Sequence, residues 1–220
     1  MQDKVGKFRI VDLSYKLVSG KEERRLAVRK EKWFIDSLEK RVAFHDSFYC
    51  DIDMMSHVGT HVEVPSHFFD KGKDVTQIPL TVFLGRTVLL DLGFIATHEA
   101  LTPEILEKAS AGMDMADAIL ILRGPSSKVK PYCTPESAHW FIKKGIKMLG
   151  WDDTISIEET EEMTREFHDI LLGHDIPFLE AITNLDKIKE TEFFLVALPL
   201  NIAGLDGCPV RAVAIEGMKF

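Results

Sequence analysis

The stretch AILILR at residues 118–123 is followed by Thr134-Pro135-Glu136 and then by a second apolar run, IKMLGW, at residues 146–151. Runs that are apolar on both faces are typical of strands buried between layers. Threonine before proline and glutamate signals a helix start, because it supplies a cap, a proline at the first helical position and an acid in the first turn. The stretch therefore predicts a strand, a helix and a second strand, which is the repeating pattern of an α/β fold.

The same signals recur along the chain. Thr102-Pro103-Glu104 repeats the helix start, and Ser156-Ile157-Glu158-Glu159 has the pattern of a capping box whose helix should end at Gly173. Further strands are predicted from the apolar runs at residues 8–13, 87–92, 193–198 and 210–215. Because no repeat, low-complexity segment or flexible linker interrupts this alternation, we expect a single α/β domain over residues 1–220.

Composition limits the classes of partner. The chain has 220 residues, 45% hydrophobic and 28% charged, which is ordinary for a globular protein. The net charge of −8 disfavours a nucleic-acid partner, which would need a clustered basic patch. No apolar run approaches a membrane span, and the N-terminal residues show no long apolar stretch, so neither a membrane partner nor a signal peptide is expected. Three well-separated cysteines without a CxxC pair favour a reduced, cytoplasmic setting.

The segment KEERRLAVRKEKW at residues 21–33 is the most basic part of the chain. Its acidic and basic residues alternate, which is typical of a solvated helix. A mobile flap over a cleft is the functional alternative.

The chemistry concentrates in SHVGTHVEVPSHFF, residues 56–69, which holds four potential ligands: His57, His61, Glu63 and His67. In an extended segment Val58, Val62 and Val64 would face the core, and the ligands would face the opposite side.

Spacing adds one constraint to that picture. His61 and Glu63 would lie about 6.6 Å apart in a strand and can share a metal, whereas His57 and His61 would lie about 13 Å apart, which is too far. Glycine allows a sharp bend, so we predict a break at Gly59-Thr60 and a strand from about residue 61 to 64.

Imidazole and carboxylate together are the ligand set of zinc, manganese or iron. Incidental surface histidines are the alternative, but four ligands in register beside a glycine break favour metal binding. Two further ligands are His168, on the helix that ends at Gly173, and Glu180, in an apolar run where an unpaired carboxylate would be costly. Taken alone, each could be an ordinary hydrogen-bonded or ion-paired residue.

The segment H-V-G-T-H-V-E-V-P-S-H, residues 57–67, resembles the signature H-x-G-T-H-x-D-x-P-x-H of the cyclase-like metal-dependent hydrolase family, which includes kynurenine formamidases and isatin hydrolases. The segment from His168 to Glu180 is similar to the family's second ligand pair. Other segments that resemble the family are DLS (12–14), GWDDTIS (150–156), TNLD (183–186) and LPLNIAGLDGCPVRAV (198–213). Glu63 stands where the family has aspartate.

The resemblance implies a fold of the swivelling β/β/α type, with a mixed central sheet or barrel-like β core flanked by helices. It also implies a role for each ligand: His57 and His61 on a first metal, Glu63 as the bridging acid, His168 on a second metal, Glu180 on both, and His67 as the acid/base. One or two divalent ions are expected, zinc first and manganese second. The implied activity is hydrolysis of a small amide, formamide or cyclic amide with metal-activated water, by a homodimer or homotetramer.

Three other activities remain open from the sequence. The fold could bind metal without hydrolysis, or it could carry a related carbon–oxygen lyase or cyclase. A thiol hydrolase would use Cys50 or Cys208 with a histidine, although buried structural cysteine is the commoner role.

Overall fold

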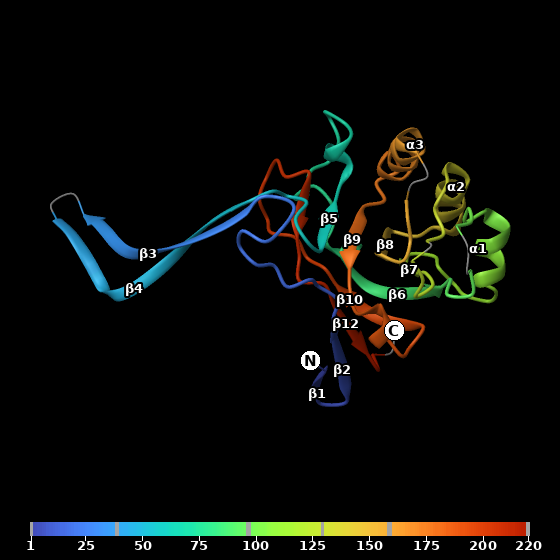
Figure 1. The fold of residues 1–220 in the computed structure, drawn as a ribbon, viewed down its shortest axis with the longest axis horizontal. Helices are drawn as coiled ribbons and strands as arrows, with labels where there is room; N and C mark the ends of the chain where they lie inside the picture. Colours follow the sequence, from blue (N-terminus) through green and yellow to red (C-terminus); the bar gives the residue numbers. More distant parts are fainter. Residues whose placement is uncertain (1, 38–39, 96–97, 129, 158–159, 219–220) are drawn as a thin grey trace.

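The computed structural model describes residues 2–37, 40–95, 98–128, 130–157 and 160–218. Within them a ten-stranded mixed sheet forms the body of the molecule (Figure 1). In spatial order its strands are β1 (Gln2–Val5), β2 (Phe8–Asp12), β12 (Val213–Glu216), β10 (Glu192–Val196), β6 (Leu84–Asp91), β7 (Ile119–Arg123), β8 (Met148–Asp152), β9 (Phe178–Ile182), β5 (His61–Glu63) and β11 (Gly207–Pro209).

The centre of the sheet is parallel and its two flanks are antiparallel. Strands β6, β7, β8 and β9 run in one direction, as the strand–helix–strand pattern predicts. Helices α1 (Pro103–Ala109), α2 (Pro135–Lys144) and α3 (Glu161–Leu172) lie together beside these strands (Figure 1). This arrangement confirms the expected α/β class with a mixed central sheet.

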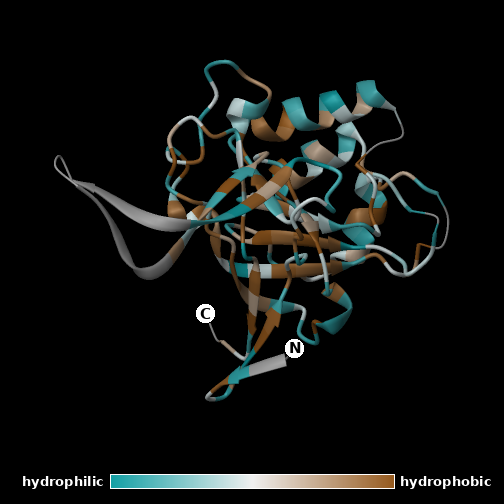
Figure 2. Ribbon diagram, turned by 60° about the vertical axis from the view of Figure 1, so that its left-hand side comes forward, coloured by the Kyte–Doolittle hydropathy of each residue, from teal (hydrophilic) through white to brown (hydrophobic). Residues whose placement is uncertain are grey.

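Two apolar clusters share the central strands. One combines alternate strand residues such as Leu120 with helix residues such as Phe141 and Phe167. The other uses the opposite strand faces and joins them to the antiparallel flanks, through residues such as Val62 and Leu195. The flanks therefore curve over the second face of the parallel strands, and apolar residues gather along the strands inside the body (Figure 2).

Local start signals place two helices as predicted. The Thr102 hydroxyl accepts from the Ile105 backbone N–H, and Thr134 forms a reciprocal capping box with Ser137. None of the helices in the described ranges is long and apolar enough to cross a membrane.

The predicted start of the third helix is wrong. Its cap is Thr160, whose hydroxyl accepts from the Met163 backbone N–H, and not Ser156. Ser156 instead accepts from Cys133 N–H and donates to Pro131 C=O, in a bridge with Tyr132. This non-local pairing keeps Ser156 out of the helix, and residues 158–159 lie outside the described ranges. The helix ends at Gly173 as predicted.

The helical interpretation of residues 21–33 is also wrong. Strand β3 (Leu26–Ser37) pairs with β4 (Lys40–Met54) in a separate two-stranded sheet, which we call the ribbon. The ribbon projects away from the body (Figure 1). Charges at alternate positions of a strand can share one face, which is why this pattern does not require a helix.

Burial predicts different reactivity for the three free cysteines. Cys133 is fully buried, which raises the pKa of its thiol to about 12, and burial also raises the pKa of Cys208. Because the thiolate is the reactive form, both should resist iodoacetamide at pH 8 in the folded protein, whereas Cys50, which is exposed in a single chain, should be alkylated when the protein is monomeric. Mass spectrometry of peptides before and after unfolding in guanidinium measures this. Rapid labelling of Cys133 without denaturant would contradict its position in the core.

Candidate metal centre

Strand β5 positions the first ligands. It pairs with β9 on one side, which sets His61 opposite Glu180, and with β11 on the other, which sets Glu63 opposite Gly207. Val62 is fully buried in the second apolar cluster, so its neighbours His61 and Glu63 point to the other face of the strand. The predicted strand and its orientation are confirmed.

The predicted break lies at Gly59, whose φ is 63°. The backbone conformation favours glycine, and a Cβ there would lie 2.5 Å from Leu17 Cδ2, so the Leu17 side chain would have to move. The bend folds His57 back, and its ring centroid lies 5.0 Å from that of His61 and 4.2 Å from that of His67. His67 ends a short 3₁₀ helix, Pro65–His67.

Helix α3 and strand β9 supply the second pair of ligands. His168 is buried, and its Nε2 lies 3.8 Å from Glu63 Oε1 and 3.9 Å from Glu180 Oε1. His61 Nε2 lies 3.7 Å from Glu180 Oε2. The structure therefore brings together residues from two stretches of chain that are more than a hundred positions apart.

Hydrogen bonds fix which ring nitrogen faces the centre. His61 Nδ1–H donates to Gly59 C=O at 2.8 Å, and His168 Nδ1–H donates to Thr164 C=O at 2.7 Å. Both rings therefore direct Nε2 inward, which is the nitrogen that a metal would bind.

Two buried atoms of the centre have no hydrogen-bond partner, His61 Nε2 and Glu63 Oε1. Buried polar atoms are almost always satisfied, so these two point to a missing cation. Ligand atoms of His61, Glu63 and Glu180 lie within 4.8 Å of one another, and so do those of His57, Glu63 and His67. The donor set thus fits a divalent metal, with Glu63 common to both groups.

The ionisation of His61 and of Glu180 matches this role. Burial lowers the pKa of His61, and the nearby Glu180 carboxylate does not reverse the shift, so the ring is neutral at pH 7. Burial raises the pKa of Glu180, but the interaction with His168 outweighs it and leaves the pKa below its ordinary value. Burial lowers the pKa of His168, but the Glu180 and Glu63 carboxylates outweigh it and raise that pKa, so a metal would displace a proton from this ring. Neutral imidazole and ionised carboxylate are the metal-binding forms.

Sequence reasoning missed Asp206. Its carboxylate contacts His67 Nδ1 at 2.8 Å and His57 Nε2 at 3.0 Å, and it accepts from the Ser56 hydroxyl at 2.8 Å. Burial raises the pKa of Asp206, but these hydrogen bonds outweigh it and hold the pKa well below its ordinary range. The available signal was a single acid within the otherwise largely apolar segment 198–213.

The centre opens into a pocket of about 790 Å³, which we call the ligand pocket. His57, His61 and Glu180 contribute to its lining, and so does Arg24, which lies just before β3. The other lining residues are Tyr15, Lys16, Leu17, Glu22, Glu23, Val58, Gly59, Lys130, Asp153 and Ala181.

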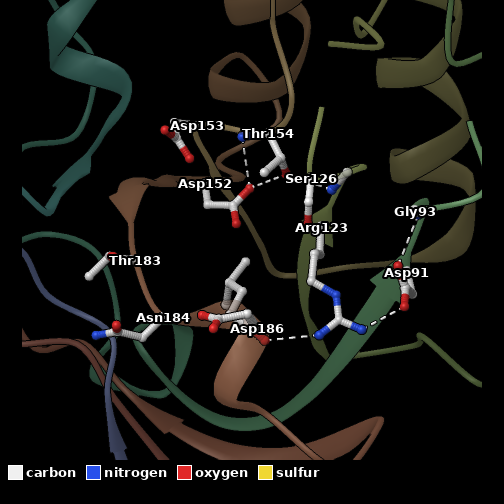
Figure 3. Close-up of a pocket in the computed structure, with 12 residues that line it drawn as sticks. Asp91, Gly93, Arg123, Ser126, Asp152, Asp153, Thr154, Thr183, Asn184 and Asp186 are labelled. Atoms are coloured by element: carbon white, nitrogen blue, oxygen red, sulfur yellow. Dashed lines mark hydrogen bonds and ion pairs between the residues drawn. The ribbon is translucent and has the colours of Figure 1, made fainter. Parts of the chain in front are cut away.

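A second pocket of about 620 Å³ lies where β6, β7 and β8 end (Figure 3). Arg123 donates there to the Asp91 carboxylate at 2.5 Å and to Leu185 C=O at 2.9 Å. Asp152 accepts from the Thr154 backbone N–H at 3.0 Å, so it closes the turn after β8. Asp153 lines both pockets.

The other described histidines and Cys208 are not part of the centre. His98 and His174 donate to the backbone carbonyls of Lys130 and Ile170, and His139 is exposed on α2. Cys208 contacts backbone atoms of Leu200 and Pro209, as a structural cysteine does. The His45 side chain lies outside the described part of the structure.

Comparisons with known proteins agree with this geometry. The Cyclase family model matches residues 11–159. A kynurenine formamidase of Bacillus cereus is 29% identical over 168 residues, which cover 74% of this chain and 77% of that protein, and the Bacillus anthracis enzyme gives the same values. Isatin hydrolase A from Labrenzia aggregata has a TM-score of 0.72 at 27% identity, over 94% of this chain and 93% of that chain. Isatin hydrolase A from Ralstonia solanacearum, at 20% identity, supports the fold alone, with a TM-score of 0.73 over 94% and 92% of the two chains.

Replacement of Gly59 by alanine tests the bend. Gly20 also has a positive φ, 75°, but a Cβ there meets nothing within 4 Å, so Gly20→Ala is a matched control. Both substitutions should lower the free energy of unfolding by about 1–2 kcal/mol, because alanine disfavours this backbone region. Only Gly59→Ala should also weaken zinc binding, since the displaced bend carries His57. Equal zinc affinity of the two variants, measured by calorimetry, would contradict a role for the bend in ligand placement.

Proposed function

The chain belongs to the Cyclase family of metal-dependent hydrolases, and from this premise we propose that it hydrolyses a small amide, formamide or cyclic amide with a bound divalent metal. The observation that carries the proposal is the pair of buried, unpartnered atoms His61 Nε2 and Glu63 Oε1, beside a pocket that His61 helps to line. The similarity to kynurenine formamidases and to an isatin hydrolase supports an acyl–nitrogen bond as the target.

The proposed metal ligands are His57, His61, Glu63, His168 and Glu180. Glu63 and Glu180 each approach more than one imidazole, which suits a pair of ions that share carboxylates. Imidazole and carboxylate ligands support zinc, with manganese as the alternative. A divalent ion held there would polarise a carbonyl oxygen and lower the pKa of water.

His67 is the proposed acid/base. Its Nδ1–H donates to Asp206, which leaves Nε2 unprotonated and directed toward the centre, 3.7 Å from Glu63 Oε2. Its side chain is 33% exposed, so substrate can reach it. His67 Nε2 would take a proton from the attacking water and return it to the leaving nitrogen as the C–N bond breaks. An imidazole suits both steps because its ordinary pKa lies close to neutral pH.

We propose that two copies of the chain associate through the ribbon. Antiparallel pairing puts the apolar residues Leu26, Val28, Cys50, Ile52 and Met54 on one face together with Lys30, and Val28 and Ile52 there are 44% and 60% exposed. The opposite face is largely charged. A two-stranded ribbon is marginally stable alone, so an apolar face of this kind requires a cover, and a second copy provides one.

The three free cysteines support a cytoplasmic setting, and the net charge of −8 supports a small-molecule substrate over nucleic acid.

Two histidine variants separate metal binding from proton transfer. His61→Ala should lose metal and turnover together, because it removes a buried ligand. His67→Ala should keep metal, and its kcat should fall about 10²–10⁴-fold. Metal content is measured by elemental analysis, and turnover with zinc and with manganese on a panel of formanilides, cyclic imides and lactams.

The exposed His139→Ala should match the parent protein in both measurements and serves as the control. Normal turnover of His67→Ala would remove its assigned role. A metal-loaded parent that hydrolyses no member of the panel would favour a binding function.

The association is tested on one strand of the ribbon. Ile52→Lys places a charge on the apolar face and should convert the dimer to a monomer in light scattering after size exclusion. Asp51→Lys places the same charge on the opposite face at the next position and should leave the dimer intact. A monomeric parent protein at about 50 μM would contradict the proposed assembly, since a stable dimer persists at such concentrations.

A further inference from the structure

The Asp206 carboxylate lies between two histidines that have different tasks in the proposed function. We propose that Asp206 is a positioning residue that fixes the ring tautomers of His57 and His67, so that both rings direct an unprotonated nitrogen toward Glu63. This inference rests on the proposed function for the tasks of the two histidines. It extends that function to a residue outside the ligand set.

Distances decide which carboxylate holds each ring. His67 Nδ1 lies 2.8 Å from Asp206 Oδ2, whereas its Nε2 lies 3.7 Å from Glu63 Oε2. For His57 the difference is smaller, 3.0 Å from Nε2 to Asp206 and 3.3 Å from Nδ1 to Glu63. In both rings the shorter contact, within ordinary hydrogen-bond length, is the one to Asp206.

Counting protons gives the tautomers. An ionised carboxylate only accepts, and a neutral imidazole has a single N–H to donate. The Asp206 contacts therefore require Nε2–H on His57 and Nδ1–H on His67. The remaining lone pairs, on His57 Nδ1 and His67 Nε2, both face the same oxygen of Glu63. Three acceptors facing one another are stable only with a cation or a proton among them, so Asp206 sets which nitrogen of each ring is left for that cation.

The backbone fixes the carboxylate in turn. Asp206 C=O accepts from Val64 N–H at 3.0 Å, and the next residue, Gly207, pairs with Glu63 across β11 and β5. A Cβ at Gly207 would lie 2.8 Å from Val62 O and 3.0 Å from His57 Cε1, so the chain approaches the ring as closely as glycine allows. The Ser56 hydroxyl donates to the second carboxylate oxygen and sets its rotation. Asp206 is therefore held from both sides at a fixed distance from the two rings.

The tautomers are read directly by two-dimensional ¹H–¹⁵N NMR of protein labelled at histidine nitrogen, with and without zinc. In the parent protein His67 should be protonated at Nδ1 and His57 at Nε2. Asp206→Asn presents an amide that can donate as well as accept, so His67 should shift at least partly to the Nε2–H form. Zinc affinity should fall about 10–100-fold, and kcat about 10²-fold with little change in KM.

Matched variants separate positioning from general damage. Asp206→Glu keeps the carboxylate and should recover part of kcat and the Nδ1–H signal, whereas Ser56→Ala should show a smaller loss. Asp114→Asn, at an acid that is 78% exposed, should behave as the parent protein.

An Nε2–H tautomer of His67 in the parent protein would overturn the inference, and so would an Asp206→Asn variant with an unchanged tautomer and a kcat within about twofold of the parent. If Asp206→Asn does not fold, the His67 tautomer in the parent spectrum and the kcat of Ser56→Ala still test the inference. The spectra need no turnover, so a parent protein with these tautomers but no hydrolytic activity would refute the proposed function and leave the positioning intact.

Discussion

The candidate metal centre depends on the register in which β5 pairs with β9 and β11. Side chains alternate along a strand, so a slip of one residue would carry His61 and Glu63 into the apolar core and bring Val62 out of it. Val62 and Val64 are both fully buried, and each contributes about 1.5–3 kcal/mol by leaving water. The apolar core, and not the ligands themselves, therefore sets the positions at which the ligand atoms meet.

Much of the fold was predictable because its signals are local. Continuous apolar runs marked six strands, and threonine–proline–glutamate marked the starts of α1 and α2. The bend at Gly59 followed from the reach of an extended chain. The start of α3 was not predictable in this way, since Ser156 has the sequence of a cap but pairs with Tyr132 and Cys133. The ribbon was missed because the charges of residues 21–33 fit a helix as well as a strand until the partner at residues 48–54 is known.

The site was predictable where ligands cluster in sequence and not where the fold assembles them. His57, His61 and Glu63 share one short segment, and His168 and Glu180 acquire their position only through α3 and β9. Asp206 lies in a loop that leads into β11, so no helix or strand pattern in the sequence predicts its position or its contacts. His61 and His168 donate to nearby backbone carbonyls, so their ring orientation is set within a few residues of each ligand. Such local bonds reduce the entropic cost of ordering the ligand side chains when a metal binds.

The ligand pocket has two kinds of wall. His61 and Glu180 line it from paired strands, whereas Lys16, Arg24 and Lys130 line it from segments outside the sheet. Loops of this kind accept substitution and insertion more readily than strands do. Proteins that evolve from such a chain can therefore change their substrate by substitutions in these loops, while the metal ligands on the strands stay the same.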